Sequence, residues 1–219
     1  MQPSPDVVKE LAPTGTLRVG INLGNVVLAQ GTPEAPRGVT VDLARELGKR
    51  LGVPLQITTV DAARKSLEAL KAGEADVIFL AIEPARATEI EFTSPYVLIE
   101  GVYLVPQDSP LKANADIDAP GIRVGVKKGS AYDLFLTRTL KHAEIVRGDE
   151  GIDIFVKEKL SAGAGVRQPV AAYAKAHPEV RLLDGRFMDI QQAMGVAKGK
   201  LAGARYLRSF IEEMKASGF

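Results

Sequence analysis

The sequence contains no cysteine. This absence excludes disulfide bonds, cysteine-based zinc sites and thiol catalysis together, and it is compatible with either an oxidising or a reducing compartment. The only two histidines, His142 and His177, have no second ligand at metal-binding spacing, and each lies near a predicted helix end among charged residues. We therefore expect no metal site and no cofactor.

An excess of charge and a long apolar run are also missing. There are 28 basic and 27 acidic residues, and no stretch concentrates lysine and arginine with interleaved aromatic residues, so nucleic acid is not an expected partner. No apolar run approaches the roughly 18 residues of a membrane span. The first residues, MQPSPDVVKELAPTG, lack the basic start and apolar centre of a signal peptide. We expect either that an export segment has been removed or that the protein stays in the cytoplasm.

The common catalytic motifs are absent as well. Gly20 and Gly24 form G-x-x-x-G, which is not a dinucleotide fingerprint, and Ser130 in KGSAYD does not lie in a G-x-S-x-G turn. Glu89 and Glu91 are more typical of a solvated helix face than of an acid/base pair. No residue is predicted to be catalytic, and the sequence does not indicate an enzyme.

The sequence does contain a regular alternation of predicted strands and helices. Its composition, 46% hydrophobic and 25% charged over 219 residues, is that of a globular protein with one large or two small domains. In the first half, strands are predicted at 17–22, 55–60 and 76–82, with helices at 40–52 and 63–73. This order is typical of a parallel sheet covered on both faces.

The same order begins again after a polar connector at 107–121. A strand predicted at 100–106 precedes the connector. After the connector, strands are predicted at 122–126, 144–147, 180–183 and 191–197, and helices at 131–142, 152–160, 169–178 and 200–218. The segment AGAGVRQ at 162–168 has no assigned type. The first strands of the two halves share R-V-G-x-x-x-G, in TLRVGINLG and GIRVGVKKG. We predict an α/β protein of two lobes, with a cleft between the carboxyl ends of their strands where such sheets bind ligands.

Arg86 occupies an unusual place in this pattern. It follows the apolar strand at 76–82 and lies just inside a short helix that Pro84 opens. A helix N-terminus carries partial positive charge, which disfavours a cation there by roughly 0.3–1 kcal/mol unless an anion is supplied. The anion could be a ligand, or a surface carboxylate such as Glu83, Glu89 or Asp76.

The motifs around Arg86 resemble those of a known family. They are GVTVDLARELGKRLG at 38–52, LKAGEAD at 70–76, Arg86 itself, FTSPY at 92–96, and VGVKKGS at 124–130. In this order and spacing they resemble the bacterial extracellular solute-binding proteins of family 3, the amino-acid-binding receptors of ABC importers. The resemblance covers nearly the whole chain and is specific as a set.

The resemblance implies a two-lobed, type II periplasmic-binding-protein fold, in which each lobe is a mostly parallel sheet flanked by helices. We expect a discontinuous first lobe, 1–104 plus 192–219, a second lobe, 105–191, and a two-stranded hinge near 102–106 and 188–194. The resemblance also implies a monomeric receptor in the periplasm that delivers its ligand to the membrane permease of an ABC importer.

In the first lobe, the resemblance implies that Arg86 clamps the carboxylate of the ligand, because a guanidinium matches a carboxylate bidentately. Phe79 and Ala81 occupy positions where the family has hydroxyl groups. Asn22 stands where receptors for cationic ligands have an acid, and Asn25 opens a loop that usually holds an aromatic residue. These five residues are the predicted ligand-binding set of the first lobe.

In the second lobe, the predicted set is Ser130, Ala131, Arg167 and Gln168. Ser130 starts an S-x-x-D pattern, so it is also a candidate helix N-cap, and the two roles can coexist. The family aspartate that takes the amino group of the ligand is replaced by Arg167 and Gln168; Arg167 could equally be a solvated loop cation. The changes favour a non-cationic ligand, an amino acid or related organic acid that is richer in negative charge or acceptors.

Two alternatives to a transport receptor follow from the same sequence. Cyclohexadienyl dehydratases resemble this family across the whole fold, and such an enzyme would need a general acid, for which Glu158, Asp153 and Asp189 are candidates. The second alternative, which the missing signal sequence leaves open, is a cytoplasmic ligand-sensing module.

Overall fold

The computed structural model describes residues 2–219, which divide into two units. Unit 1 contains the residues up to Val97 together with Gln191–Phe219, and unit 2 is the continuous run Leu98–Ile190. Two strands carry the chain from one unit to the other, β7 (Val97–Pro106) and β12 (Met188–Ala197). These are the strands in which the sequence analysis places the hinge. The lobe boundaries after residues 104 and 191 stay a prediction.

Unit 1 is built on three parallel strands. β1 (Leu17–Asn22) lies between β4 (Leu55–Val60) and β5 (Val77–Ala81), and β12 adds to the other edge of β5 in the antiparallel direction. β5 is buried along its whole length. That burial explains why its sequence is a continuous apolar run instead of an alternating one.

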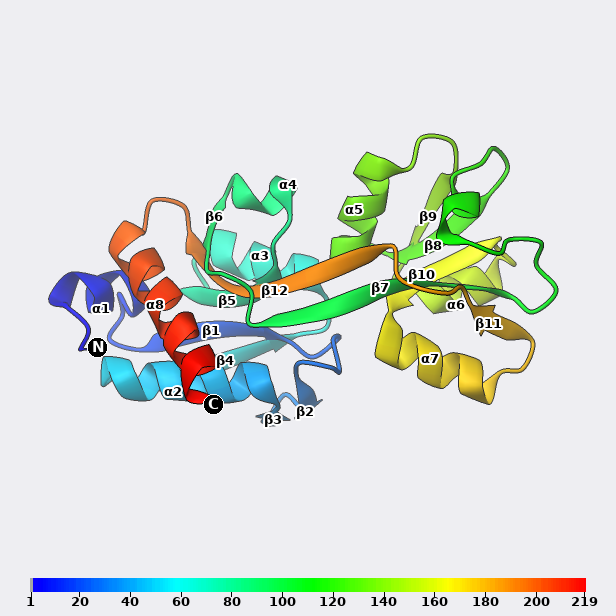
Figure 1. The fold of residues 1–219 in the computed structure, drawn as a ribbon. Coiled ribbons are helices and arrows are strands. Elements are labelled where there is room, and N and C mark those ends of the chain that lie inside the picture. Colours follow the sequence, from blue (N-terminus) through cyan, green and yellow to red (C-terminus); the bar gives the residue numbers. More distant parts are fainter. Residues whose placement is uncertain (1) are drawn as a thin grey trace. The chain divides into compact units, whose positions relative to one another are not determined.

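Helices cover this sheet on both faces (Figure 1). Val77 and Phe79 of β5 join a core that includes residues of α1 (Pro5–Leu11), α2 (Val39–Leu51) and α8 (Leu201–Ser217), whereas Ile78 and Leu80 pack in a second core with α3 (Ala63–Lys71). α8 packs on α1, and a side chain at Gly203 would meet Leu11 at 2.7 Å. The last helix therefore belongs to unit 1.

Several short elements of unit 1 were not predicted. They are α1, which Ser4 caps, the hairpin of β2 (Gln30–Thr32) and β3 (Ala35–Arg37), and β6 (Ile90–Phe92). The hairpin has no buried residue, so it leaves no apolar pattern in the sequence. The predicted one-turn helix is present as α4 (Pro84–Ala87), with Pro84 in its first position.

Within unit 2 the strands pair in the order β7, β10, β8, β9. β10 (Ala162–Val166), β8 (Arg123–Lys127) and β9 (Glu144–Gly148) run parallel, and β7 is antiparallel to β10 and to β11 (Val180–Leu182). Figure 1 shows α5 (Ala131–Thr139) on one side of this sheet and α6 (Gly151–Lys157) with α7 (Arg167–Ala176) on the other. A 3-10 turn, η1 (Asn114–Ile117), lies in the connector after β7.

β10 is the segment AGAGV, to which the sequence analysis assigns no structure. It is the central strand of unit 2 and is almost entirely buried. No helix among residues 2–219 is long and apolar enough to cross a membrane. The described residues also contain no group of three or more histidine, cysteine or carboxylate side chains that could hold a metal ion.

Candidate functional site

In unit 1 the predicted residues gather at one edge of the sheet. β1, β4 and β5 are parallel, so their carboxyl ends, at Asn22, Val60 and Ala81, meet at the same edge. α4 follows β5 directly and brings Arg86 to this edge. We call the set Asn22, Asn25, Phe79, Ala81 and Arg86 the unit 1 edge.

The guanidinium of Arg86 is buried at this edge. The residue is 3% exposed, and its Nη1 donates a 3.0 Å hydrogen bond to the carbonyl oxygen of Ala81. Two of the surface partners considered for it are engaged elsewhere, because Asp76 pairs with Arg18 and Glu89 with Lys71. Arg86 is therefore not a solvated surface cation.

Electrostatics at Arg86 are set by burial and by one neighbouring carboxylate. Burial lowers the pKa of Arg86 to about 10, and the negative charge of Glu83, itself a buried residue, acts in the opposite direction. A guanidinium with this pKa is still cationic at pH 7. Because α4 is a single turn, the attraction for an anion at this edge must come from the side chain and not from a helix terminus.

The other members of the unit 1 edge have structural contacts. Oδ1 of Asn22 accepts a 2.8 Å hydrogen bond from the amide of Gly24, and Oδ1 of Asn25 accepts one from the amide of Val27 at 3.3 Å. Phe79 is 4% exposed and packs edge-on against the ring of Tyr96. Ala81 contributes its carbonyl oxygen to Arg86.

In unit 2 the predicted residues again lie at the carboxyl ends of parallel strands. α5 begins shortly after β8, so Ser130 and Ala131 follow the carboxyl end of β8. α7 begins directly after β10, so Arg167 and Gln168 follow the carboxyl end of β10, which is parallel to β8. We call these four residues the unit 2 edge. Ser130 is the N-cap of α5, as its S-x-x-D pattern predicts, since its Oγ accepts a 3.0 Å hydrogen bond from the amide of Asp133.

A buried carboxylate holds the start of α5 in place. Asp133 accepts hydrogen bonds from the amide of Gly129 at 2.8 Å and from Nε of Arg147 at 3.0 and 3.1 Å. Arg147 also donates to Thr137 at 2.7 Å, so α5 is tied to β9. This network fixes the backbone amides that follow Ser130.

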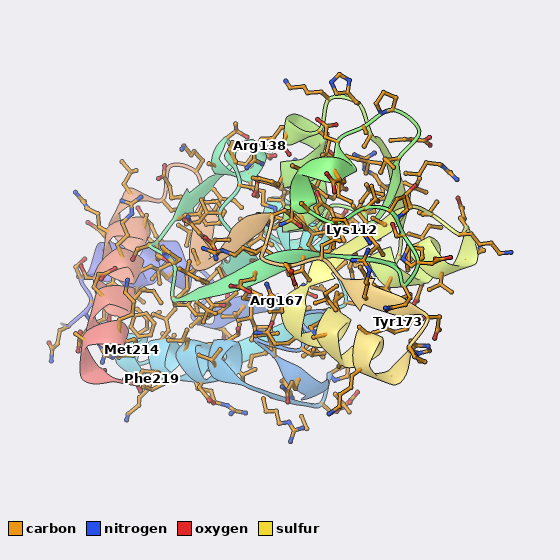
Figure 2. The ribbon with its side chains drawn as sticks, turned by 45° about the vertical axis from the view of Figure 1, so that its right-hand side comes forward. Lys112, Arg138, Arg167, Tyr173, Met214 and Phe219 are labelled. Atoms are coloured by element: carbon orange, nitrogen blue, oxygen red, sulfur yellow. The ribbon has the colours of Figure 1, made fainter. Side chains whose placement is uncertain are left out.

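Arg167 is an ion-paired residue rather than a free loop cation. It lies at the start of α7, next to β7 (Figure 2), where its Nε donates to the carboxylate of Glu100 and its Nη2 to the carbonyl of Gly185 at 2.6 Å. Arg186 lies 3.8 Å from the other oxygen of Glu100. About a third of the Arg167 side chain stays exposed, and the neighbouring Gln168 is exposed.

Sequence reasoning missed the acidic partners at these edges. Glu100 is a charged residue inside the apolar run VLIEGVYLV. This interruption was the one sequence signal that Glu100 has a specific partner. Lys127 at the end of β8 is also largely buried and pairs with Glu150, which precedes α6. Nothing in the sequence pattern links Lys127 to Glu150.

Comparisons with known proteins identify the fold. A mutant of ArgBP from T. maritima superimposes with a TM-score of 0.76 at 26% identity, covering 97% of this chain and 94% of that one. An ancestral amino-acid-binding protein described as a precursor of cyclohexadienyl dehydratase gives a TM-score of 0.74 at 25% identity, covering 96% and 94%. The predicted fold class, the type II periplasmic-binding-protein fold, is confirmed.

Curated relatives match over shorter stretches. A probable histidine-binding protein of Neisseria gonorrhoeae is 27% identical over 163 residues, which is 68% of this chain and 59% of the relative. The virulence sensor protein BvgS of Bordetella bronchiseptica is 29% identical over 119 residues, and the match spans about a tenth of that sensor's length. The model of one family matches residues 17–219, and the chain belongs to that family, the bacterial extracellular solute-binding proteins, family 3.

Proposed function

We propose that the protein is the solute-binding receptor of an ABC-type importer and that it binds a small carboxylate-bearing molecule, an amino acid or a related organic acid, through Arg86. Family membership supports the receptor role, and structural neighbours in the family are amino-acid-binding proteins of ABC transporters. The observation that carries the ligand assignment is a cationic guanidinium, 3% exposed, at the carboxyl edge of the unit 1 sheet. Receptors of this family are extracellular, which favours a location outside the cytoplasm.

The ligand is expected to be non-cationic. The polar side chains of the unit 1 edge are a guanidinium and two neutral amides, and the carboxylate beside the unit 2 edge, Glu100, is neutralised by Arg167. A second cationic group, on the side chain of the ligand, would meet no unpaired carboxylate among these residues, and burying such a charge without a partner is unfavourable. The arginine, lysine and histidine named for several relatives are therefore not carried over to this chain.

A ligand screen tests the proposal. The probes are the twenty L-amino acids and a set of mono- and dicarboxylic acids, and the measurement is the thermal unfolding midpoint, followed by calorimetry of the best binders. A probe at 100 times its Kd stabilises the folded state by about 2.7 kcal/mol, which corresponds to a shift of roughly 5–10 °C for a chain of this size. Stabilisation by neutral or acidic probes is expected. Micromolar binding of lysine, arginine or histidine would contradict the ligand class, and no stabilisation by any carboxylate would contradict the anchor.

Two other functions have a specific observation in their favour. The ancestral dehydratase precursor among the structural neighbours supports an enzyme on the same fold. However, Glu158 and Asp189 are exposed and paired with arginines, which is unlike a general acid held in a dry site. The match to BvgS supports a ligand-sensing module. Turnover of prephenate or arogenate would favour the enzyme. Binding of a ligand that no ABC importer transports with this protein would favour the sensor.

A further inference from the structure

Gln192 is a buried polar residue of unit 1 to which no role has been assigned. It lies on β12 opposite Ala81 of β5 and is 8% exposed. The amide of Ile82 donates to the carbonyl of Gln191 at 2.9 Å, so Ala81 and Gln192 form a non-hydrogen-bonded pair. In such pairs the side chains lie close together on one face of the sheet.

The backbone of Gln192 is held on its other side by Tyr96. The amide of Tyr96 donates to the carbonyl of Gln192 at 2.8 Å, and the phenol of Tyr96 is hydrogen-bonded to Thr40 at 3.1 Å. The next residue of β12 on the same face, Met194, is fully buried in the apolar core. An apolar residue would therefore suit this position as far as packing is concerned.

The side-chain amide of Gln192 has no side-chain or backbone hydrogen-bond partner among residues 2–219. It is also not among the fully enclosed polar atoms that lack a partner, which are Ser66 Oγ and Asn114 Oδ1. The small exposed fraction of Gln192 thus includes its amide. A buried residue whose polar end is unpaired and still reachable is favourable only when something else supplies the hydrogen bonds.

Ala81 connects this amide to Arg86. The side chain of Ala81 faces Gln192 across the two strands, and its carbonyl oxygen accepts the hydrogen bond of Arg86 Nη1. The guanidinium and the amide therefore flank the same residue of β5. Resting on the function proposed above, we propose that Gln192 contacts the ligand and accepts a hydrogen bond from the group on the carbon next to the carboxylate that Arg86 holds.

This role selects a chemical class. An amide oxygen accepts from an ammonium or from a hydroxyl group, so Gln192 favours 2-amino acids and 2-hydroxy acids over unsubstituted carboxylic acids. Because it is neutral, it discriminates less between amine and hydroxyl than a carboxylate would. The acceptor is supplied by unit 1, from the strand that pairs with β5.

The test compares Gln192→Met with Gln191→Met, because Gln191 is exposed and its side chain lies on the opposite face of the same strand. The probes are the L-amino acids that stabilise the wild type, with their 2-hydroxy and unsubstituted analogues. For Gln192→Met we expect 2-amino and 2-hydroxy acids to bind about 10–100-fold more weakly, about 1.4–2.8 kcal/mol. Unsubstituted acids should bind within threefold of wild type, the unfolding midpoint should not fall, and Gln191→Met should change nothing.

The two proposals fail in different ways. If no carboxylate stabilises the wild type, the proposed function fails and this inference with it. If carboxylates bind but Gln192→Met weakens no class selectively, or weakens all three classes equally, only the role of Gln192 is overturned. Should Gln192→Met not fold, Gln192→Asn, which keeps the amide but shortens the side chain, must show the same selective loss.

Discussion

Arg18 and Asp76 pair through two parallel hydrogen bonds, with Nη2 of Arg18 2.7 Å from Oδ1 of Asp76 and Nε 2.9 Å from Oδ2. The carboxylate is 3% exposed and the arginine 22%. The pair joins β1 to the residue that precedes β5, so it fixes the register of the two strands that form the unit 1 edge. Such fork-to-fork pairs are among the stronger side-chain interactions.

Arg18→Met should therefore destabilise the protein. It leaves a buried carboxylate without its partner, for which a loss of about 3 kcal/mol in the free energy of unfolding is expected. Arg45→Met is the matched control, since Arg45 pairs with Asp42 at 3.4 Å in an exposed position and should cost less than about 1 kcal/mol. Urea unfolding of both variants checks this. Equal losses would show that the burial of Asp76 does not matter.

Arg86→Ala should abolish most ligand binding. An unpaired, desolvated ligand carboxylate costs about 3–5 kcal/mol, or roughly 200-fold to several thousand-fold in Kd by calorimetry. Arg86→Lys should restore only part of the lost binding affinity, because lysine keeps the charge but lacks the planar guanidinium group. Stability will fall too, since Arg86 is buried and bonded to Ala81. Glu83→Gln is the control: it also alters a buried charge but should keep or strengthen binding. Binding by Arg86→Ala within threefold of wild type would disprove the anchor.

The pH dependence of binding follows from the same residue. Burial lowers the pKa of Arg86 to about 10, so the guanidinium is predominantly charged below pH 9. Affinity for a carboxylate should be constant from pH 6 to 9 and fall as pH rises through about 10. The effect on folding has the opposite sign, because deprotonation removes the cost of a buried cation. Calorimetric titrations at pH 7, 9 and 10.5 test this, and a fall in affinity below pH 8 would implicate another group.

Glu100→Gln should make Arg167 more available to anions. Removing the carboxylate leaves Arg167 hydrogen-bonded to Gly185 but no longer neutralised. Because the Arg167 side chain is a third exposed, a modest gain of about two- to fivefold in affinity for dicarboxylates is expected, with a steeper salt dependence. Glu158→Gln, which removes one of the two carboxylates paired with Arg123 in the same unit, should have no effect. An unchanged affinity for dicarboxylates in Glu100→Gln would place Arg167 outside the ligand site.

Asp118 should support acid stability in unit 2. Its carboxylate accepts hydrogen bonds from the amides of Lys141, His142 and Ala143, and the bond from His142 contributes most to a pKa below the usual range. A carboxyl with a lowered pKa stabilises the fold at neutral pH and loses this effect as pH falls below about 4. Asp118→Asn should lower the unfolding midpoint at pH 7 and flatten its decline between pH 5 and 3. Exposed Asp108→Asn should change neither quantity.

Local patterns were sufficient to predict most of the fold. The apolar run at β5 and the helical spacing of α2 are each explained by burial on a regular period. β10 was different, because Gly163 and Gly165 are poor strand formers. A side chain at Gly165 would meet Val170 at 2.6 Å, and one at Gly163 would meet Phe155 at 2.9 Å. The glycines are therefore required by helices that pack closely on the strand, which a local pattern does not reveal.

The candidate site was predictable only in part, for a similar reason. Ser130 was predictable as an N-cap because its partner is three residues away. Arg167 and Glu100 are 67 residues apart and meet through the register of β7 and β10. Gln192 lies opposite Ala81, the residue that binds Arg86, only through the pairing of β5 with β12. A single sequence does not contain these registers.

The two strand crossings make each unit a separable piece of chain. In unit 1 the amide of Tyr96 donates to the carbonyl of Gln192, and in unit 2 the amide of Phe187 donates to that of Gly101. The points where the chain leaves and re-enters each unit are thus hydrogen-bonded neighbours. A short turn joining Val97 to Gln191 would close unit 1 as one polypeptide, and Leu98–Ile190 could be expressed as another. Genetic exchange of one unit for that of a relative would then require only two cuts, both in paired strands.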